Sequence, residues 1–219
     1  MTIKAPYLPY EKLREIADRF LTQYHPSGRI PVPIAEIVEF QFGMDIVPVP
    51  GLNEFLEMDS SISNDLATIY IDASVFARQP SRYRFSLAHE VSHRLIHGDL
   101  FREQLSFGNL AEWKAAMIAI PLKEYGFIEW QAYCLAGLIL VPSGPLAAAY
   151  EKVEKDAAEA GISLRDLDAE SGRTICAAIG RDFQVSSAVI RKRLHYDHHS
   201  PLVIYPPGLR SSYPAPWGR

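Results

Sequence analysis

The chain has 219 residues, of which 48% are hydrophobic and 22% are charged. These ordinary globular proportions exclude an intrinsically disordered chain and predict one large domain, or one domain with an appendage. The formal net charge of −4, without a long basic run, argues against a broad electrostatic surface for nucleic acid.

Neither export nor a membrane span is indicated by the sequence. Its first residues contain no apolar segment, and no run approaches the roughly 18 apolar residues that a span requires. We therefore expect a cytoplasmic protein with no membrane partner. The two cysteines, Cys134 and Cys176, are too few for a disulfide framework and are expected to be reduced thiols in the core.

The first third of the chain predicts two helices followed by a small sheet. Apolar residues at helical spacing indicate a helix over 10–24, and a shorter helix opens at the prolines of 31–41. Alternating residues predict a strand over 44–49, and 60–72 has the pattern of a hairpin. Its second strand, 66–72, is either a cradle that holds a peptide by β-augmentation or an ordinary sheet strand.

The strongest chemical signal is His89-Glu90-Val91-Ser92-His93, an H-E-x-x-H pattern. Histidines four residues apart lie on one face of a helix with Cβ atoms roughly 5–6 Å apart, so both imidazoles can bind one ion. Glu90 lies on the adjoining face, where its carboxylate can reach a water on that ion and act as a general base. The alternative is a core helix whose histidines bond to other side chains.

A helix is expected across this motif, over 82–97. Leu87 and Val91 belong to an apolar stripe at four-residue spacing, and Gly98 is a natural stop. His97 cannot share the same ion, because eight helical residues span about 12 Å and each metal bond is only about 2.1 Å long. We expect His97 to pack near the ligands or to support them.

A third metal ligand must come from elsewhere in the chain. Glu129 lies at the head of a second apolar helix that ends at Pro142. Packed against the first helix, it would complete two histidines and one carboxylate, with one position left for water. The segment between the two helices contains three rival carboxylates, Glu103, Glu112 and Glu124. Its helical middle, 109–120, is expected to form a lid or wall over the cleft.

Two stretches of the sequence resemble a known family. The segment R-F-S-L-A-H-E-V-S-H-R-L-I-H is similar to the core of the ImmA/IrrE-type zinc metallopeptidases. The residues from Glu129 to Pro142 follow that family's downstream E-x-x-A-x-x-x-A-x-x-L-L-x-P pattern without a gap. The resemblance implies a minimal zincin-like fold with His89, His93 and Glu129 as Zn²⁺ ligands and Glu90 as the catalytic carboxylate.

The chain departs from the family pattern in three places. Ser92 replaces the usual glycine, and Tyr133 replaces the usual asparagine. The 35 residues between His93 and Glu129 are more than the family commonly has. None of these departures removes a ligand, but the first two are expected to change the lining near the metal.

The last third of the chain predicts further helices and an extended tail. The alanine-rich stretch 146–160 is helical, and an appendage over 163–195 contains two helices, 173–183 and 187–194, joined by a tight turn. This pair resembles a helix-turn-helix and carries basic residues, namely Arg181, Arg191, Lys192 and Arg193. Direct nucleic-acid binding is less favoured, because no phosphate-contacting arm is evident. The proline-rich stretch 201–219 is a tail.

A histidine cluster lies just before the tail and comprises His195, His198 and His199. Exposed histidines in a tail are the commoner explanation, although one of them could approach the metal cleft. His195 is also one of three candidates for a second stabiliser of the oxyanion, together with Tyr125 and Tyr133.

These features predict an α+β, minimal zincin-like fold over 1–200, with a small antiparallel sheet, an active-site helix and additional helices. The expected function is a zinc-dependent endopeptidase. The family resemblance implies a protein substrate, typically a helix-turn-helix repressor cut at one site. Two alternatives stay open: a non-proteolytic regulatory binding protein that retains the fold, and a DNA-binding regulator that uses the 173–194 helix pair.

Overall fold

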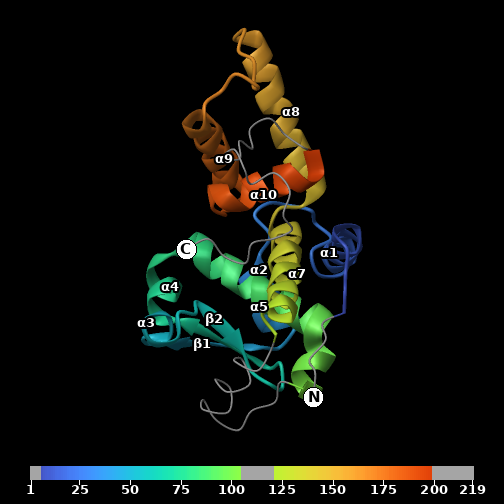
Figure 1. Cartoon of the computed structure of the whole chain (residues 1–219), viewed down its shortest axis with the longest axis vertical. Helices are drawn as coiled ribbons and strands as arrows, with labels where there is room; N and C mark the ends of the chain where they lie inside the picture. The colour runs from blue at the N-terminus through green and yellow to red at the C-terminus, as the bar shows by residue number, and fades with distance from the viewer. Residues whose placement is uncertain (1–5, 105–120, 199–219) are drawn as a thin grey trace.

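The computed structural model describes residues 6–104 and 121–198 and shows an α+β fold, which confirms the expected class. Helices predominate, and a three-stranded sheet lies in the lower half of the described structure (Figure 1). Along the chain the elements are α1 (Tyr10–Tyr24), α2 (Ile34–Glu36), the π-helix η1 (Ile37–Gln41), β1 (Asp45–Val49), α3 (Leu52–Leu56), β2 (Ser60–Ile62), β3 (Thr68–Asp72), α4 (Ala73–Arg78), α5 (Pro80–Gln104), α7 (Leu122–Leu140), α8 (Ser143–Glu159), α9 (Ala169–Phe183) and α10 (Ser187–His198).

The sheet is mixed, with the strand order β1-β3-β2. β2 pairs antiparallel to β3, whereas β1 pairs parallel to it, with Ile46 opposite Ile69. The expectation of an antiparallel sheet is therefore wrong for one of the two strand pairs. The connection explains the difference, because α3 and β2 lie between β1 and β3 in the chain. They return the chain to the end of the sheet at which β1 begins, so that β3 can run in the same direction as β1.

The strand order also corrects the cradle hypothesis for 66–72. β3, which lies in this stretch, is paired on one side with β1 and on the other with β2, so its backbone cannot take up an additional strand. β2 is the edge strand on the side of α5, which it contacts. An extended ligand that joins this sheet near α5 would therefore pair with β2.

The two helices expected to carry the metal site are longer than the sequence pattern indicated. α5 extends beyond 82–97 at both ends, with Pro80 in its first turn, where a missing backbone N–H is tolerated. α7 starts at Leu122, so Glu129 lies inside the helix rather than at its head. The candidate ligands His89, His93 and Glu129 are thus carried by helices that continue on either side of them.

Gly98 does not end α5, although the sequence suggested that it would. A Cβ atom added at this position would lie 3.3 Å from Cδ1 of Leu66 in the turn between β2 and β3. Such a contact is tighter than ordinary packing allows, so glycine lets α5 pass close to this turn.

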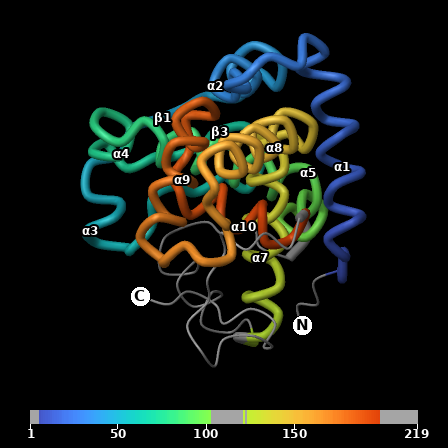
Figure 2. The backbone as a smooth tube through the Cα atoms, turned by 90° about the horizontal axis from the view of Figure 1, so that it is seen from above, coloured from blue at the N-terminus to red at the C-terminus, as the bar shows by residue number. Residues whose placement is uncertain are grey.

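The core lies between α1, α5, α7 and the sheet. Among the described elements α5 and α7 make the most extensive contact, and α1 packs on α7 (Figures 1 and 2). Fully buried side chains from all four components meet there, including Leu13, Leu87, Val91, Leu135, Ile139 and Ile69. Both cysteines are buried and free of disulfides, as expected. The helices that carry the candidate site are therefore held by the main core.

α8, α9 and α10 form the part of the molecule farthest from the sheet (Figure 1). α10 packs against α9 and α7. Its Arg193 is only 2% exposed, donates from Nε to the carbonyl of Val141 at 3.2 Å, and contacts Tyr10 and Asp197. Arg193 therefore ties α10 to the body of the protein, and this one of the four basic residues of the helix-turn-helix hypothesis is not available to contact a DNA phosphate.

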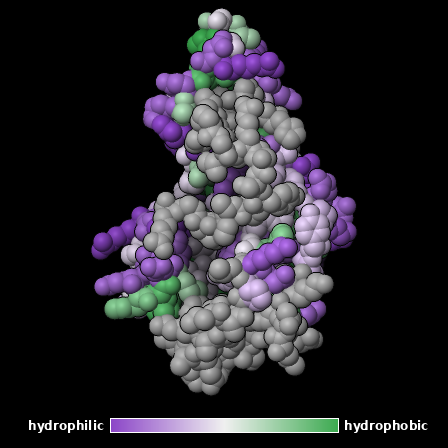
Figure 3. Space-filling view, viewed as in Figure 1, coloured by the Kyte–Doolittle hydropathy of each residue, from purple (hydrophilic) through white to green (hydrophobic). Residues whose placement is uncertain are grey.

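Hydrophobic surface gathers over α3 (Figure 3). Phe55 on α3 is 75% exposed, and Phe76 on α4 is 46% exposed. Because α3 directly precedes β2 in the chain, the edge strand begins beside an apolar surface.

Several expectations lie outside the described residues. These are the lid over 109–120, the tail over 201–219, and the side chains of His198 and His199. Within the described ranges, no single helix is long and apolar enough to cross a membrane. One helix pair, Lys123–Leu140 with Ser143–Glu159, satisfies length and composition together but is bent by 71°.

Candidate metal centre

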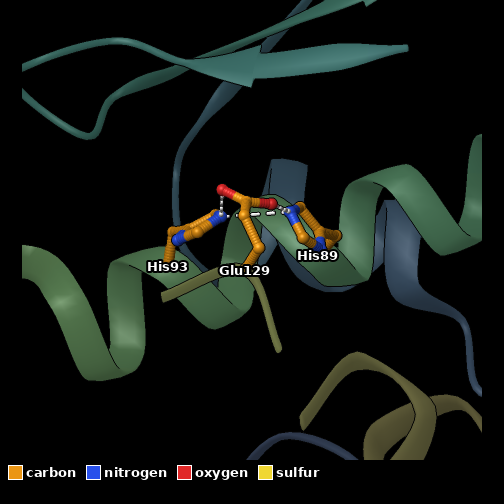
Figure 4. A group of neighbouring side chains, drawn as sticks. All are labelled: His89, His93 and Glu129. Atoms are coloured by element: carbon orange, nitrogen blue, oxygen red, sulfur yellow. Dashed lines mark hydrogen bonds and ion pairs between the residues drawn. The ribbon is translucent and has the colours of Figure 1, made fainter. Parts of the chain in front are cut away.

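Three side chains from α5 and α7 converge on one point (Figure 4). His89 and His93 lie on successive turns of α5, and their Nε2 atoms are 3.0 Å apart. Glu129 reaches them from α7: its Oε2 lies 3.2 Å from Nε2 of His89, and its Oε1 lies 3.6 Å from Nε2 of His93. Among residues 6–104 and 121–198, this is the one group of such donors with metal-binding spacing.

The spacing of these donors fits a small divalent ion. In tetrahedral coordination with bonds of about 2.0–2.1 Å, neighbouring ligand atoms lie about 3.3 Å apart. The three separations of 3.0, 3.2 and 3.6 Å lie on both sides of this value. Two imidazoles and one carboxylate also form the ligand set of catalytic zinc sites that keep a fourth position open. The residues present therefore fit Zn²⁺.

The electrostatics of the cluster favour an ionised Glu129 and a neutral His93. Burial acts to raise the pKa of Glu129, but the hydrogen bond with His89 and the charges of the histidines outweigh it and lower this pKa to about 2. Burial acts to lower the pKa of His89, whereas Glu129 raises it above its ordinary value. Burial holds the pKa of His93 well below its ordinary value, although Glu129 opposes this. An ionised carboxylate and a neutral imidazole are the forms that ligate metals.

Glu90 lies between α5 and the edge strand β2. It is 4% exposed, and its Oε1 accepts a 2.6 Å hydrogen bond from Oγ of Ser60. Burial raises the pKa of Glu90, against the charge of His89 and the hydrogen bond from Ser60. A carboxylate with a raised pKa accepts a proton more readily near neutral pH, as a general base must. Ser60 was not identified from the sequence, because a lone serine in a strand carries no functional signal.

A chain of hydrogen bonds runs from His93 into the interior. Nδ1 of His93 lies 3.0 Å from Nδ1 of His97, and Nε2 of His97 lies 3.0 Å from Oε1 of Gln131 on α7. Nε2 of Gln131 donates to the carbonyl of Pro6 at 2.7 Å. Burial lowers the pKa of His97 to about 4, although Gln131 and Glu129 act to raise it. His97 thus lies behind the candidate ligand His93 and outside the group of three, as expected, whereas Gln131 was missed.

Of the three rival carboxylates, the structure describes the side chain of Glu124 and not those of the other two. Glu124 lies on α7, but it is not among the three clustered donors of the described residues. Glu112 and the side chain of Glu103 lie outside the described part of the chain. Glu129 is therefore the carboxylate that the structure brings to the two histidines.

Of the three candidates for an oxyanion stabiliser, Tyr125 is the one whose surroundings include the site. Burial, followed by the charges of Glu129 and Glu90, raises the pKa of its phenol. Tyr125 precedes Glu129 by one turn of α7, so its ring leaves the helix on the same side. Its hydroxyl is therefore placed in the field of both carboxylates.

The other two candidates have different neighbours. The ring of Tyr133 packs on Phe85, with centroids 4.6 Å apart, and the ammonium of Lys192 lies 3.7 Å from its centroid. His195 is on α10, where its ring lies edge-on to Tyr196 with centroids 5.3 Å apart. His195 is not among the clustered donors of the described residues.

Ser92, which replaces the usual glycine of the family pattern, is fully buried. Its Oγ donates to the carbonyl of Ala88 at 2.7 Å, one turn earlier on the same helix. The additional hydroxyl is therefore satisfied within α5.

Comparisons with known proteins give limited information. No family model matches the chain, and no curated protein matches it. Among solved structures, a Mycobacterium tuberculosis transcriptional regulator is similar over 84% of this chain, with 18% identity and a TM-score of 0.48. The match covers 46% of that regulator, so the chain spans less than half of its length. At this level of similarity, neither the function nor the fold of the regulator is transferred to this chain.

Proposed function

We propose that this chain is a zinc-dependent peptide hydrolase. The observation that carries the proposal is the convergence of His89, His93 and Glu129 at 3.0–3.6 Å beside the buried carboxylate of Glu90. Two imidazoles and a carboxylate would hold the ion and leave a fourth position for solvent or substrate.

The chemistry divides between the ion and Glu90. When bound, zinc would lower the pKa of a coordinated water toward about 7 and polarise the scissile carbonyl. Glu90 would accept the proton of the attacking water and deliver it to the leaving amine. The hydroxyl of Ser60 donates to Oε1 of Glu90, and the backbone N–H of Ile62 also donates to this carboxylate, so both would hold it in place for the proton transfer.

The edge strand β2 would position the peptide. One side of this strand pairs with β3, and its other edge can pair with an extended substrate. The strand is linked to the general base through Ser60. Exposed Phe55 adds an apolar surface beside the beginning of β2, where substrate side chains could pack. The hydroxyl of Tyr125 would stabilise the oxyanion.

The proposal extends to the class of substrate. The side chains of His89 and Glu129 are only 15% and 16% exposed, so a substrate must insert an extended segment rather than present a folded surface. The resemblance to the ImmA/IrrE-type family adds a regulatory protein cut at one site, with a helix-turn-helix repressor as the first candidate. A folded repressor would be cut in an exposed linker.

The test is the Glu90→Gln variant of the full chain. The zinc-loaded protein is incubated with a proteome-derived peptide library, and new ends are identified by mass spectrometry. Glu90→Gln should keep its zinc content and lose cleavage by about 10²–10⁴-fold, because a general base contributes that much. Glu124→Gln is the matched control and should cleave like the wild type. Cleavage that is equal in wild type and Glu90→Gln, or absent from both, overturns the proposal.

A further inference from the structure

The hydrogen-bond chain behind His93 has a definite direction, which begins at the carbonyl of Pro6. A carbonyl only accepts, so the group of Gln131 that lies 2.7 Å from it must be the amide NH₂. The opposite orientation would place two oxygens against each other at this distance. The Oε1 atom of Gln131 is therefore the one that faces His97.

The next two bonds follow from this orientation. Because Oε1 of Gln131 accepts, Nε2 of His97 must carry a proton. A neutral His97 then has a lone pair on Nδ1, and this atom lies 3.0 Å from Nδ1 of His93. His93 must donate there, so its proton is on Nδ1 and its lone pair is on Nε2, the atom that faces His89 and Glu129.

Burial of the three side chains excludes the reversed order of hydrogen bonds. His93, His97 and Gln131 are 3%, 1% and 0% exposed, so solvent cannot satisfy a reversed chain. In the reversed order, a lone pair of His97 would face Oε1 of Gln131, and Nε2 of His93 would carry the proton. An Nε2–H cannot ligate a metal through that nitrogen.

We propose that Pro6, Gln131 and His97 act as a positioning relay that fixes His93 in its Nδ1–H tautomer. The relay makes the segment before α1 a part of the metal site, although that segment lies far from His93 in sequence. The effect of the relay on zinc affinity rests on the proposed function, because it requires that the cluster binds zinc. The tautomer of His93 depends neither on zinc nor on catalysis.

The direct test is the tautomer of His93 in the full-length wild-type protein after chelator treatment. Long-range ¹H–¹⁵N correlation spectra of ¹⁵N-labelled histidine distinguish the protonated ring nitrogen from the bare one. Near neutral pH, His93 should carry its proton on Nδ1 and His97 on Nε2. A proton on Nε2 of His93 overturns the proposal. This readout stands even if the protein cleaves no peptide.

Gln131→Met tests the relay, because it keeps the length of the side chain and removes the acceptor for His97. The zinc dissociation constant should rise about 10–100-fold, the usual effect of removing a hydrogen-bond partner of a ligand. The His93 spectrum should become a mixture of tautomers. A dissociation constant within twofold of the wild type, with the Nδ1–H form retained, overturns the proposal.

Trp130→Phe is the matched control, because it removes a hydrogen bond from the neighbouring position of α7. Nε1 of Trp130 donates to the hydroxyl of Tyr196 at 3.3 Å, outside the relay. This variant should retain the wild-type tautomer and zinc affinity. If it changes both as much as Gln131→Met does, general loosening of α7 explains the effect and the relay is wrong. If the wild type fails to bind zinc, the proposed function falls, and the His93 spectrum still decides the relay.

Discussion

Oγ of Ser60 on the edge strand lies 2.6 Å from Oε1 of Glu90 on α5. This contact, together with a hydrogen bond from the backbone N–H of Ile62, joins the strand that would hold a peptide to the group that would move the proton. The strand also packs against the helix, and the chain connects the two through β3 and α4. Substrate binding at β2 could therefore influence the orientation of the general base directly.

Ser60→Ala should move the acidic limb of the pH–rate profile to higher pH. The Ser60 hydrogen bond acts to lower the pKa of Glu90, so its removal lets this pKa rise further. Glu90 must be ionised to accept a proton, so activity is lost at a higher pH on the acidic side. Below the shifted limb the rate should fall about tenfold or more, as expected for a hydrogen bond to a charged group. Ser61→Ala is the control, and an unmoved limb would contradict the assignment.

Glu129→Gln should change the pH dependence of stability in chelator-treated protein. The lowered pKa of Glu129 gives stability above its unfolded value of 4.5, which is lost as pH falls toward about 2. The raised pKa of His89 gives stability below its unfolded value of 6.5, which is lost as pH rises through its folded value. The pair therefore stabilises most between 4.5 and 6.5.

Thermal unfolding across pH measures this effect. In that window Glu129→Gln should lower the free energy of unfolding by about 1.5–3 kcal/mol, the usual contribution of a hydrogen bond to a charged group. The difference from wild type should shrink near pH 2 and again at high pH. A difference that is constant with pH would mean that no ion pair forms.

Arg193→Ala should destabilise the protein by about 3–5 kcal/mol, the usual cost of breaking a buried ion pair. The guanidinium is buried with Asp197 and bonds to the carbonyl of Val141, so its removal leaves both without this partner. Arg191→Ala, at a half-buried position on the same helix, should cost less than about 1 kcal/mol. Chemical denaturation of both variants measures this. Equal stability of the two variants would show that Arg193 does not hold α10 in place.

The parts of the site that could be predicted are those encoded by local spacing. Two histidines four residues apart determine their own geometry once a helix forms, so His89 and His93 could be paired from the sequence. Glu129 was also placed correctly, but for the wrong reason, since it lies inside α7 rather than at its head. The packing of α7 on α5, not the helix end, brings it to the histidines.

The parts that could not be predicted depend on long-range contacts. Gln131 reaches Pro6 across 125 positions of the chain, and Ser60 reaches Glu90 across 30. No local hydrophobic period or sequence motif indicates contacts between residues so far apart in the chain. The parallel pairing of β1 with β3 was missed for the same reason, because strand order follows from tertiary packing rather than from alternation within each strand.

Tyr125→Phe should lower kcat without changing zinc affinity, if its hydroxyl donates to the oxyanion. Its phenol lies in the field of Glu129 and Glu90, and loss of one such donor usually costs about 10²–10³-fold in kcat. Tyr133→Phe keeps the ring that packs on Phe85, so it should leave kcat nearly unchanged and serves as the matched control. Single-turnover kinetics on one cleaved peptide separate chemistry from binding. A rise in KM with unchanged kcat would assign Tyr125 to substrate binding instead. An equal fall in kcat in both variants would assign it to packing.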